Sequence, residues 1–249
     1  MKNALKTLAA AAILTVSLSG CSLVDAAFDG DGDDVWKSQT ESDPTPFDHG
    51  ESDYYTVKGP AVVKYDPAPG DDPVYGDLDE LERPTHVYAM LTETVDSDAT
   101  SRADTPGMEH NTETDISALD AIKGSSDYHG WIYNRSHLLA DSLGGSEGLE
   151  NMVTGTRTQN VGSTQVEGEY AGGMAYSERI ARKYLNTNDG WQCPLYYAAT
   201  PNFSGDELIP RTVTVDMRNC DGEIDEHIVV VNTAAGHEIN YTDGSFTRQ

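Results

Sequence analysis

The feature that most constrains the fold is the point along the chain at which a hydrophobic core becomes possible. From Ser22 to Asp53 the chain holds ten Asp or Glu residues against one Lys, with Gly, Ser and Pro between them. Such a segment buries too little apolar surface to offset the entropy lost on ordering. We therefore expect an acidic, disordered tether over residues 21–53. One globular domain over residues 54–249 is then long enough to enclose a proper core.

The first twenty residues have the order of a secretory signal. Two lysines precede an apolar run from Leu8 to Val16, which is too short for a comfortable membrane span. The next residues, Leu18-Ser19-Gly20-Cys21, match the lipobox of bacterial lipoproteins. This resemblance implies that residues 1–20 are a signal peptide, that cleavage precedes Cys21, and that its sulfur carries a diacylglycerol. We expect an extracytoplasmic protein that is anchored to the bacterial membrane or released from it. An ordinary cleaved signal with a chance cysteine is the alternative.

Only Cys193 and Cys220 remain once the signal region is set aside. Two thiols in an oxidising compartment most simply form one disulfide. They make a poor zinc site, because a structural zinc ion normally takes four Cys or His ligands.

The charge of the chain is strongly negative. The formal net charge is −26, and loss of the two signal lysines leaves 14 basic against 42 acidic residues, or −28. By itself this argues against nucleic-acid binding, which depends largely on Lys and Arg. Screening limits the objection, since the Debye length at physiological salt is about 8 Å and a local basic patch can act on an acidic body. Solubility at a cell surface is the default interpretation of the acidity.

The pattern of the domain predicts an α+β fold with a mostly antiparallel sheet. Apolar residues alternate at Val213, Val215 and Met217, whereas those of Met174–Leu185 recur at the helical period. The strand candidates are Ala61–Tyr65, His86–Thr92, Gly130–Tyr133, Leu195–Ala199, Thr212–Arg218 and His227–Val231. Further short helices are expected around Leu78 and Leu81 and over Ile116–Ile122.

One stretch of the domain offers the groups that phosphodiester hydrolysis requires, namely a base, a cation site and donors to the phosphate. His137 can serve as the base, because imidazole titrates near pH 6.5. Arg135 lies two residues earlier, on the same side of a strand, where its guanidinium can fork onto a phosphate. Asn160 supplies a neutral oxygen of the kind that Mg²⁺ accepts.

Asn134-Arg135-Ser136-His137, followed by Asn151 and then by Asn160, resembles the motif of a known enzyme family. The family is that of the bacterial DNA/RNA non-specific endonucleases of the ββα-metal (His-Me finger) group, close to the DNA-entry and secreted DNases. The resemblance spans about Asp127 to Leu185. It implies a ββα-metal motif, Mg²⁺ as cofactor with Mn²⁺ able to substitute, DNA and RNA as substrates, and products with 5′-phosphates.

The resemblance also assigns roles residue by residue. His137 falls on the water-activating histidine, Arg135 on the phosphate-contacting arginine, and Asn160 on the metal-ligating asparagine. Asn151 falls on an asparagine of the metal-site network, and Glu178 on a helix glutamate that orients metal-bound water. Asn134 and Ser136 depart from the Asp and Gly that are usual in the family, which leaves the orientation of Arg135 and the local backbone open.

Basic residues near the motif are candidates for binding the backbone of the substrate, namely Arg157, Arg179 and Arg182. Arg179 and Arg182 share one helix face with Lys183. Base-reading elements are absent, in agreement with low sequence specificity. Three alternatives stay open. His129 is a competing base, the chain could be a non-catalytic surface lipoprotein that binds nucleic acid for uptake, and a metallohydrolase site could lie elsewhere.

Overall fold

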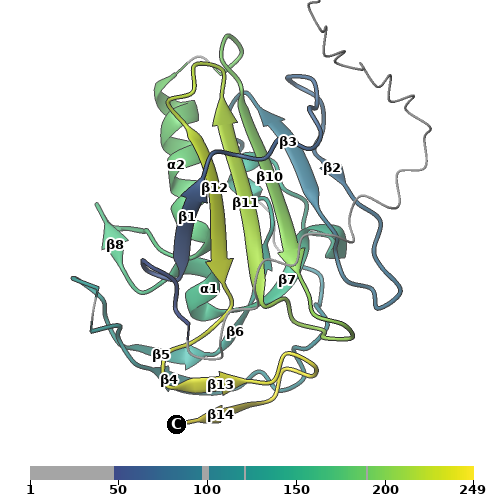
Figure 1. Cartoon of the computed structure of the whole chain (residues 1–249). Coiled ribbons are helices and arrows are strands. Elements are labelled where there is room, and N and C mark those ends of the chain that lie inside the picture. Colours follow the sequence, from purple (N-terminus) through teal and green to yellow (C-terminus); the bar gives the residue numbers. More distant parts are fainter. Residues whose placement is uncertain (1–47, 97–100, 121, 189) are drawn as a thin grey trace, which may run out of the picture. The chain divides into compact units, whose positions relative to one another are not determined.

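The computed structural model describes residues 48–96, 101–120, 122–188 and 190–249. The predicted signal, Cys21 and most of the predicted tether lie outside these ranges. The described chain is built around an antiparallel sheet in the order β1-β12-β11-β10-β3-β2 (Figure 1). These strands are β1 Tyr55–Gly59, β12 Asp225–Val231, β11 Thr212–Asn219, β10 Leu195–Asn202, β3 Val87–Leu91 and β2 Val74–Tyr75. The predicted α+β class and antiparallel pairing are confirmed.

The core lies between this sheet and helix α2, Met174–Thr187. Val213, Val215 and Met217 of β11 are fully buried, as their alternation predicts. Met174, Ala181 and Leu185 of α2 meet them in the same apolar cluster, because residues at this spacing share one helix face. Figure 1 shows α2 running along the face of the sheet.

The remaining elements are short. They are the strands β4 Glu113–Ile116, β5 Tyr128–Trp131, β6 Tyr133–His137, β7 Met152–Thr156, β8 Gln165–Val166, β9 Glu169–Tyr170, β13 His237–Ile239 and β14 Phe246–Arg248, and helix α1 Arg157–Val161. Two 3₁₀ turns, Asp141–Leu143 and Leu149–Asn151, connect β6 to β7.

The structure corrects one predicted strand. Ala61–Tyr65 is no strand, and the edge of the sheet is β1 instead. The backbone N–H groups of Ala61 and Val62 donate to the carboxylates of Asp225 and Asp216, at 2.9 and 2.7 Å. Side chains thus take the place of a neighbouring strand, and a β-type sequence pattern cannot distinguish these two ways of satisfying the backbone.

Two predicted helices are also absent from the described residues. The segment around Leu78 and Leu81 is a turn, in which Asp79 accepts hydrogen bonds from the backbone N–H groups of Leu81 and Arg83. Residues 116–122 begin with the end of β4, which pairs with β5. Ile116 is buried in a small cluster with Ala234 and Ala235, so tertiary packing outweighs its local helical pattern.

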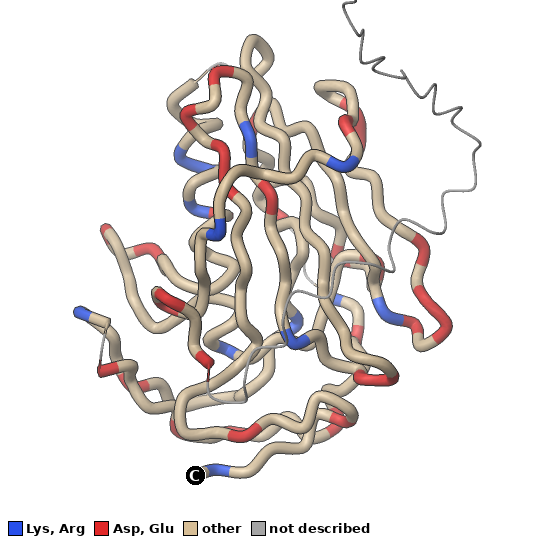
Figure 2. The backbone as a smooth tube through the Cα atoms, viewed as in Figure 1, with Lys and Arg blue, Asp and Glu red and all other residues tan. Residues whose placement is uncertain are grey.

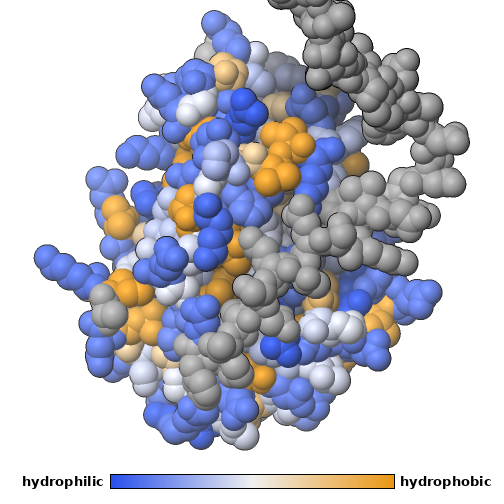
Figure 3. Space-filling model, viewed as in Figure 1, coloured by the Kyte–Doolittle hydropathy of each residue, from blue (hydrophilic) through white to orange (hydrophobic). Residues whose placement is uncertain are grey.

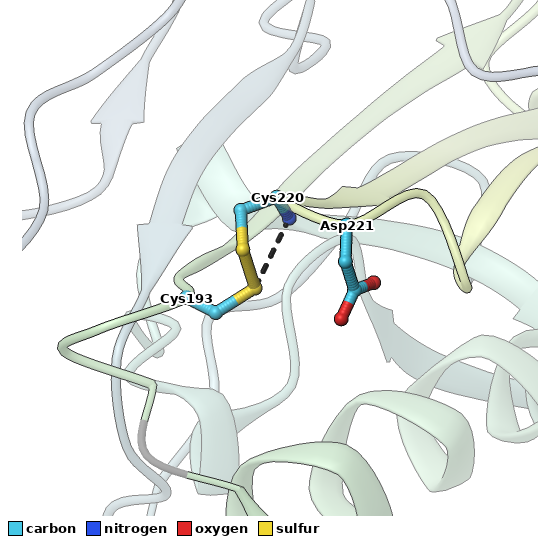
Figure 4. A group of neighbouring side chains, drawn as sticks. All are labelled: Cys193, Cys220 and Asp221. Atoms are coloured by element: carbon cyan, nitrogen blue, oxygen red, sulfur yellow. Dashed lines mark hydrogen bonds between the residues drawn. A yellow bond between two sulfur atoms is a disulfide. The ribbon is translucent and has the colours of Figure 1, made fainter.

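The predicted disulfide is confirmed. Cys193 and Cys220 are bonded just beyond the pair Leu195–Asn219, at the end of the sheet where β10 begins and β11 ends (Figure 4). The backbone N–H of Cys220 also lies 3.2 Å from the sulfur of Cys193. Asp221 lies nearby, but both sulfurs are used in the disulfide and this cluster offers no thiolate to a metal ion.

The packed domain begins before the expected boundary at Tyr54. The carboxylate of Asp53 is buried and accepts hydrogen bonds from the backbone N–H groups and the hydroxyls of Ser163 and Thr164, at 2.6–2.9 Å. His49 Nδ1 also lies 3.1 Å from Thr233 Oγ1. The last residues of the predicted tether therefore belong to the fold, because their polar groups find specific partners there.

The face of the described chain that Figure 3 shows is mostly hydrophilic, with apolar side chains between the polar ones. Acidic positions are spread over many loops, while several basic positions lie on α2 (Figure 2). No helix among the described residues has the length and apolar character needed to cross a membrane.

Candidate active site

The sequence motif folds into a unit of two antiparallel strands followed by a helix. Strand β6 pairs with β7, which places Arg135 opposite Thr154 and His137 opposite Met152. Helix α1 follows directly, and its N-cap Thr156 accepts a hydrogen bond from Gln159 N. Helix α1 packs against both strands and against α2, and so it links the motif to the longer helix.

Asn151 organises the long connection between β6 and β7. Its Nδ2 donates to the carbonyls of Leu139 and Ser146 at 2.8 Å, and its Oδ1 accepts from Leu139 N at 2.9 Å. The side chain is fully buried. Its amide oxygen and nitrogen thus both bond within the connection, which favours an ordering role, and its predicted part in binding the metal stays a prediction.

His137 is buried and paired with Glu147 of this connection. Its Nε2 lies 3.0 Å from Glu147 Oε1, and Glu147 Oε2 lies 3.2 Å from Arg102 Nε. Burial and the Arg102 charge hold the pKa of His137 below its usual value of 6.5, although Glu147 and Asp141 act in the opposite direction. His137 is therefore neutral near pH 7, as a proton acceptor must be.

Asn160 is half-buried on α1 and is tied to the same strand as His137. Its Oδ1 accepts a hydrogen bond from Ser136 Oγ at 3.0 Å. Ser136 is buried, and the pairing of β6 with β7 continues regularly through it. The extra Cβ and hydroxyl at this position therefore fit the strand, and the hydroxyl orients the amide of Asn160.

Glu178 lies on α2 and is largely shielded from solvent. Burial raises its pKa to about 7, and Asp141 adds to the rise while Arg182 opposes it. Arg102 and Asp141 also act on the pKa of His137, so the two residues share these charged neighbours.

The residue types that α1, α2 and the connection between β6 and β7 supply suit a hard divalent cation. Asn160 offers an amide oxygen, and Glu178 and Asp141 offer carboxylates, which are the ligand types that Mg²⁺ accepts. The raised pKa of Glu178 shows that its negative charge is incompletely compensated by the neighbouring arginines. An added cation would relieve that imbalance, so the residues present fit the metal that the motif implies.

The predicted substrate-binding arginines have separate surroundings. Arg135 forms an ion pair with the exposed carboxylate of Asp104. Arg157 is stacked between the rings of Tyr128 and Tyr170, at 5.0 and 4.6 Å from their centroids.

The two arginines of α2 interact with different groups. Arg182 lies between Glu178 and Glu169, at 3.7 and 3.6 Å. Arg179 lies close enough to Tyr55 and Tyr176 to lower the pKa of both phenols, which burial nevertheless keeps raised. Arg182 is thus already engaged by carboxylates, and the common basic face of α2 stays a prediction.

Three residues that act on the pKa of His137 were missed from the sequence. Glu147 and Arg102 lie in loops and Asp141 begins a 3₁₀ turn, and no spacing rule relates these residues to His137. The acidic residue in a Gly-rich segment directly after the motif was the one available signal. The competing base, His129, lies in a different, exposed group, in which its Nδ1 is 2.6 Å from Asp115.

Comparison with known proteins adds independent findings. The family model described as DNA/RNA non-specific endonuclease matches residues 63–220. A deoxyribonuclease of Streptococcus dysgalactiae subsp. equisimilis is 39% identical over 126 residues, which cover 51% of this chain. The match spans only 36% of that enzyme, about a third of its length.

Solved structures share the fold. A structure of Sda1 nuclease with a bound zinc ion has a TM-score of 0.65 at 26% identity, and the match covers 80% of this chain and 98% of that one. NucA from Streptococcus agalactiae with bound magnesium has a TM-score of 0.54 at 22% identity, over 71% of this chain and 77% of NucA. At that identity the likeness to NucA concerns the fold alone.

Proposed function

The chain belongs to the DNA/RNA non-specific endonuclease family, and we propose that it is an Mg²⁺-dependent endonuclease that hydrolyses phosphodiester bonds of DNA and RNA. The observation that carries the proposal is the buried His137–Glu147 pair, which shares the charged neighbours Arg102 and Asp141 with Glu178, together with the hydrogen bond from Ser136 to Asn160. In this proposal the β6–β7–α1 unit is a ββα-metal motif.

His137 is the general base. A carboxylate only accepts hydrogen bonds, so the contact with Glu147 assigns the proton to Nε2 and leaves Nδ1 free to take a proton from the attacking water. Glu147 fixes the ring and stabilises the imidazolium that forms. Arg102 holds the far oxygen of Glu147 and so keeps the carboxylate in place.

Arg135 positions the scissile phosphate, and Asn160 and Glu178 would hold the cation. Bound Mg²⁺ supplies positive charge that stabilises the leaving oxygen. Arg135 reaches the phosphate only by exchanging its present partner Asp104 for a phosphate oxygen. Support for a divalent metal comes from the relatives, since Sda1 was solved with zinc and NucA with magnesium. We expect Mn²⁺ to substitute for Mg²⁺.

The proposed place of action is the outer surface of the cell membrane. The sequence pattern of a signal over residues 1–20 and the lipobox-like residues that end at Cys21 support this, and the disulfide fits an oxidising compartment. Radiolabelled fatty acid incorporated by the wild type but not by Cys21→Ala would test the anchor.

The deciding experiment is digestion of plasmid DNA and of RNA by the wild type, His137→Ala and His129→Ala, each with Mg²⁺ and with EDTA. Loss of a general base costs roughly 10²- to 10⁴-fold in rate, so His137→Ala should fall by at least 100-fold. His129→Ala, the matched control on an exposed histidine, should keep wild-type activity. Cutting that persists in EDTA, or full activity in His137→Ala, would overturn the proposal.

A second candidate is a surface lipoprotein that binds nucleic acid for uptake without cutting it. The pairing of Arg135 with Asp104 favours this candidate, as does Asn134 in place of the usual Asp. It predicts that DNA is retained on the protein and is not shortened in Mg²⁺ or Mn²⁺.

A further inference from the structure

A groove runs beside the candidate active site, between the loop of residues 102–111 and strands β5 and β6. Its volume is about 700 Å³. Arg102 and Arg135 line it near the site, and Trp131 and Tyr133 line it with them. Tyr133 is buried, so the groove combines guanidinium groups with one exposed aromatic ring, the indole of Trp131, and these are the two kinds of side chain that bind single-stranded nucleic acids.

Trp131 is the unusual member of this lining. Its side chain is 53% exposed, although indole is among the largest apolar groups that a fold can bury. A single exposed apolar residue is common and needs no explanation. Trp131, however, shares its groove with Arg135, which the proposed function places on the substrate phosphate.

Two links connect the groove to the catalytic groups. Arg102, in the groove wall, contacts Glu147, which in turn contacts His137. Arg135 is two residues before His137 on β6, so both side chains leave the same face of that strand. A strand whose phosphate binds Arg135 would thus lay its neighbouring nucleotides along the groove.

We propose that Trp131 is a stacking subsite for an unpaired nucleobase of the substrate strand. The inference rests on the proposed function and extends it to the form of the substrate. In a duplex the faces of a base are covered by its neighbours in the stack, and only an unpaired or splayed base offers a face to the indole. The subsite therefore favours single-stranded or locally open nucleic acid over regular duplex, and it contacts the base without reading its edge.

The first test measures binding in EDTA, where no cleavage is expected. The probes are a short fluorescein-labelled all-thymidine DNA strand and a labelled duplex, and the readout is anisotropy. Trp131→Ala should weaken single-strand binding by at least about fivefold, the lower end for loss of one stacked base, and Trp131→Phe should retain most of the affinity. Duplex binding should change less. Thermal unfolding of each variant checks that the fold is intact.

Trp191→Ala is the matched control, since Trp191 is also exposed, at 59%, and does not line the groove. It should bind both probes as the wild type does. Equal affinities of Trp131→Ala and Trp191→Ala for the single strand would overturn the proposal. So would an equal loss on duplex and single strand, which would indicate a role unrelated to base stacking.

A second test removes the base in place of the indole. Strands with one abasic position, moved along the oligonucleotide, should bind the wild type more weakly at one position and should bind Trp131→Ala equally at all positions. The proposal would be overturned if the abasic position weakened binding to Trp131→Ala as much as it weakens binding to the wild type. If the wild type shows this pattern yet cuts nothing in Mg²⁺, the endonuclease proposal fails and the subsite stands; if it cuts but Trp131→Ala binds normally, the reverse holds.

Discussion

The charges around His137 predict how activity depends on pH. Burial and Arg102 disfavour the imidazolium, and the pKa is lowered from 6.5 despite Glu147 and Asp141. The base must be neutral, so the acidic limb of kcat/KM should lie below pH 6.5. Arg102→Gln removes a charge that lowers the pKa and should move the limb to higher pH, whereas Glu147→Gln should move it to lower pH and also reduce kcat. Shifts in the same direction for both variants would contradict this account of the site.

Asp104 predicts a gain of affinity on mutation. Asp104→Asn frees Arg135 from its carboxylate partner, and an exposed ion pair of this kind is worth up to about 1 kcal/mol. KM for DNA should therefore fall by about two- to fivefold with kcat unchanged. Glu109→Gln, which removes another carboxylate of the same groove, is the control for a general charge effect. Equal effects of the two variants on KM would show that Asp104 acts only through the general negative charge of the groove and not through its ion pair with Arg135.

The residues that the sequence could predict are those fixed by a motif. The spacing between His137 and Asn160 is set by a strand, a connection and a helix, and this spacing can be read in the amino-acid sequence. Glu147, Arg102 and Asp104 lie in loops whose paths depend on the whole fold. For the same reason the sequence did not show that Arg182 would be held between two glutamates.

At the scale of elements, the segment before β1 holds the junction of the two helices. Asp53 accepts hydrogen bonds from the residues that follow α1, and its carbonyl accepts one from Gly173 N at the start of α2. The space is tight, since a Cβ on Gly162 or Gly172 would lie 2.5 Å or less from the Asp53 carboxylate. This segment thus fixes the helices that carry Asn160 and Glu178.

Asp53→Ala should therefore destabilise the domain by roughly 2–4 kcal/mol, because several buried donors lose a charged acceptor. For a domain of this size the melting temperature should fall by at least about 4 °C. Asp48→Ala, on an exposed carboxylate of the same segment, should stay within about 0.5 kcal/mol of the wild type. Circular dichroism during heating measures both variants, and similar melting temperatures would contradict the role given to Asp53.

Sequence periodicity predicted the elements that pack on the main core. Helix α2 and strands β3, β10, β11 and β12 follow from apolar spacing, because their burial is one-sided or complete. Periodicity failed at Ala61–Tyr65, where the carboxylate of Asp216 binds the backbone. It also failed at Ile116–Ile122, whose first residue pairs with strand β5. Local patterns carry no information about such partners.

For the molecule as a whole, the disulfide predicts a large contribution to stability. Cys193 and Cys220 are separated by 27 residues, and closing a loop of this length in the unfolded chain stabilises the fold by about 3–4 kcal/mol. Denaturant unfolding of the oxidised and reduced protein should show this difference. Cys193→Ser should match the reduced wild type, and a difference below about 1 kcal/mol would contradict the prediction.

The position of this disulfide has a topological consequence. Strands β10 and β11 are joined by their own hairpin connection at one end and by sulfur at the other, so the two central strands of the sheet form a closed covalent ring. In such a ring neither end of the β10–β11 pair is free, so the hydrogen bonds between the two strands cannot be broken one after another from an end. Fraying of the outer strands would stop at β10 and β11. Because proteases attack locally opened chains, they would gain access to the centre of the sheet only when it opens as a unit.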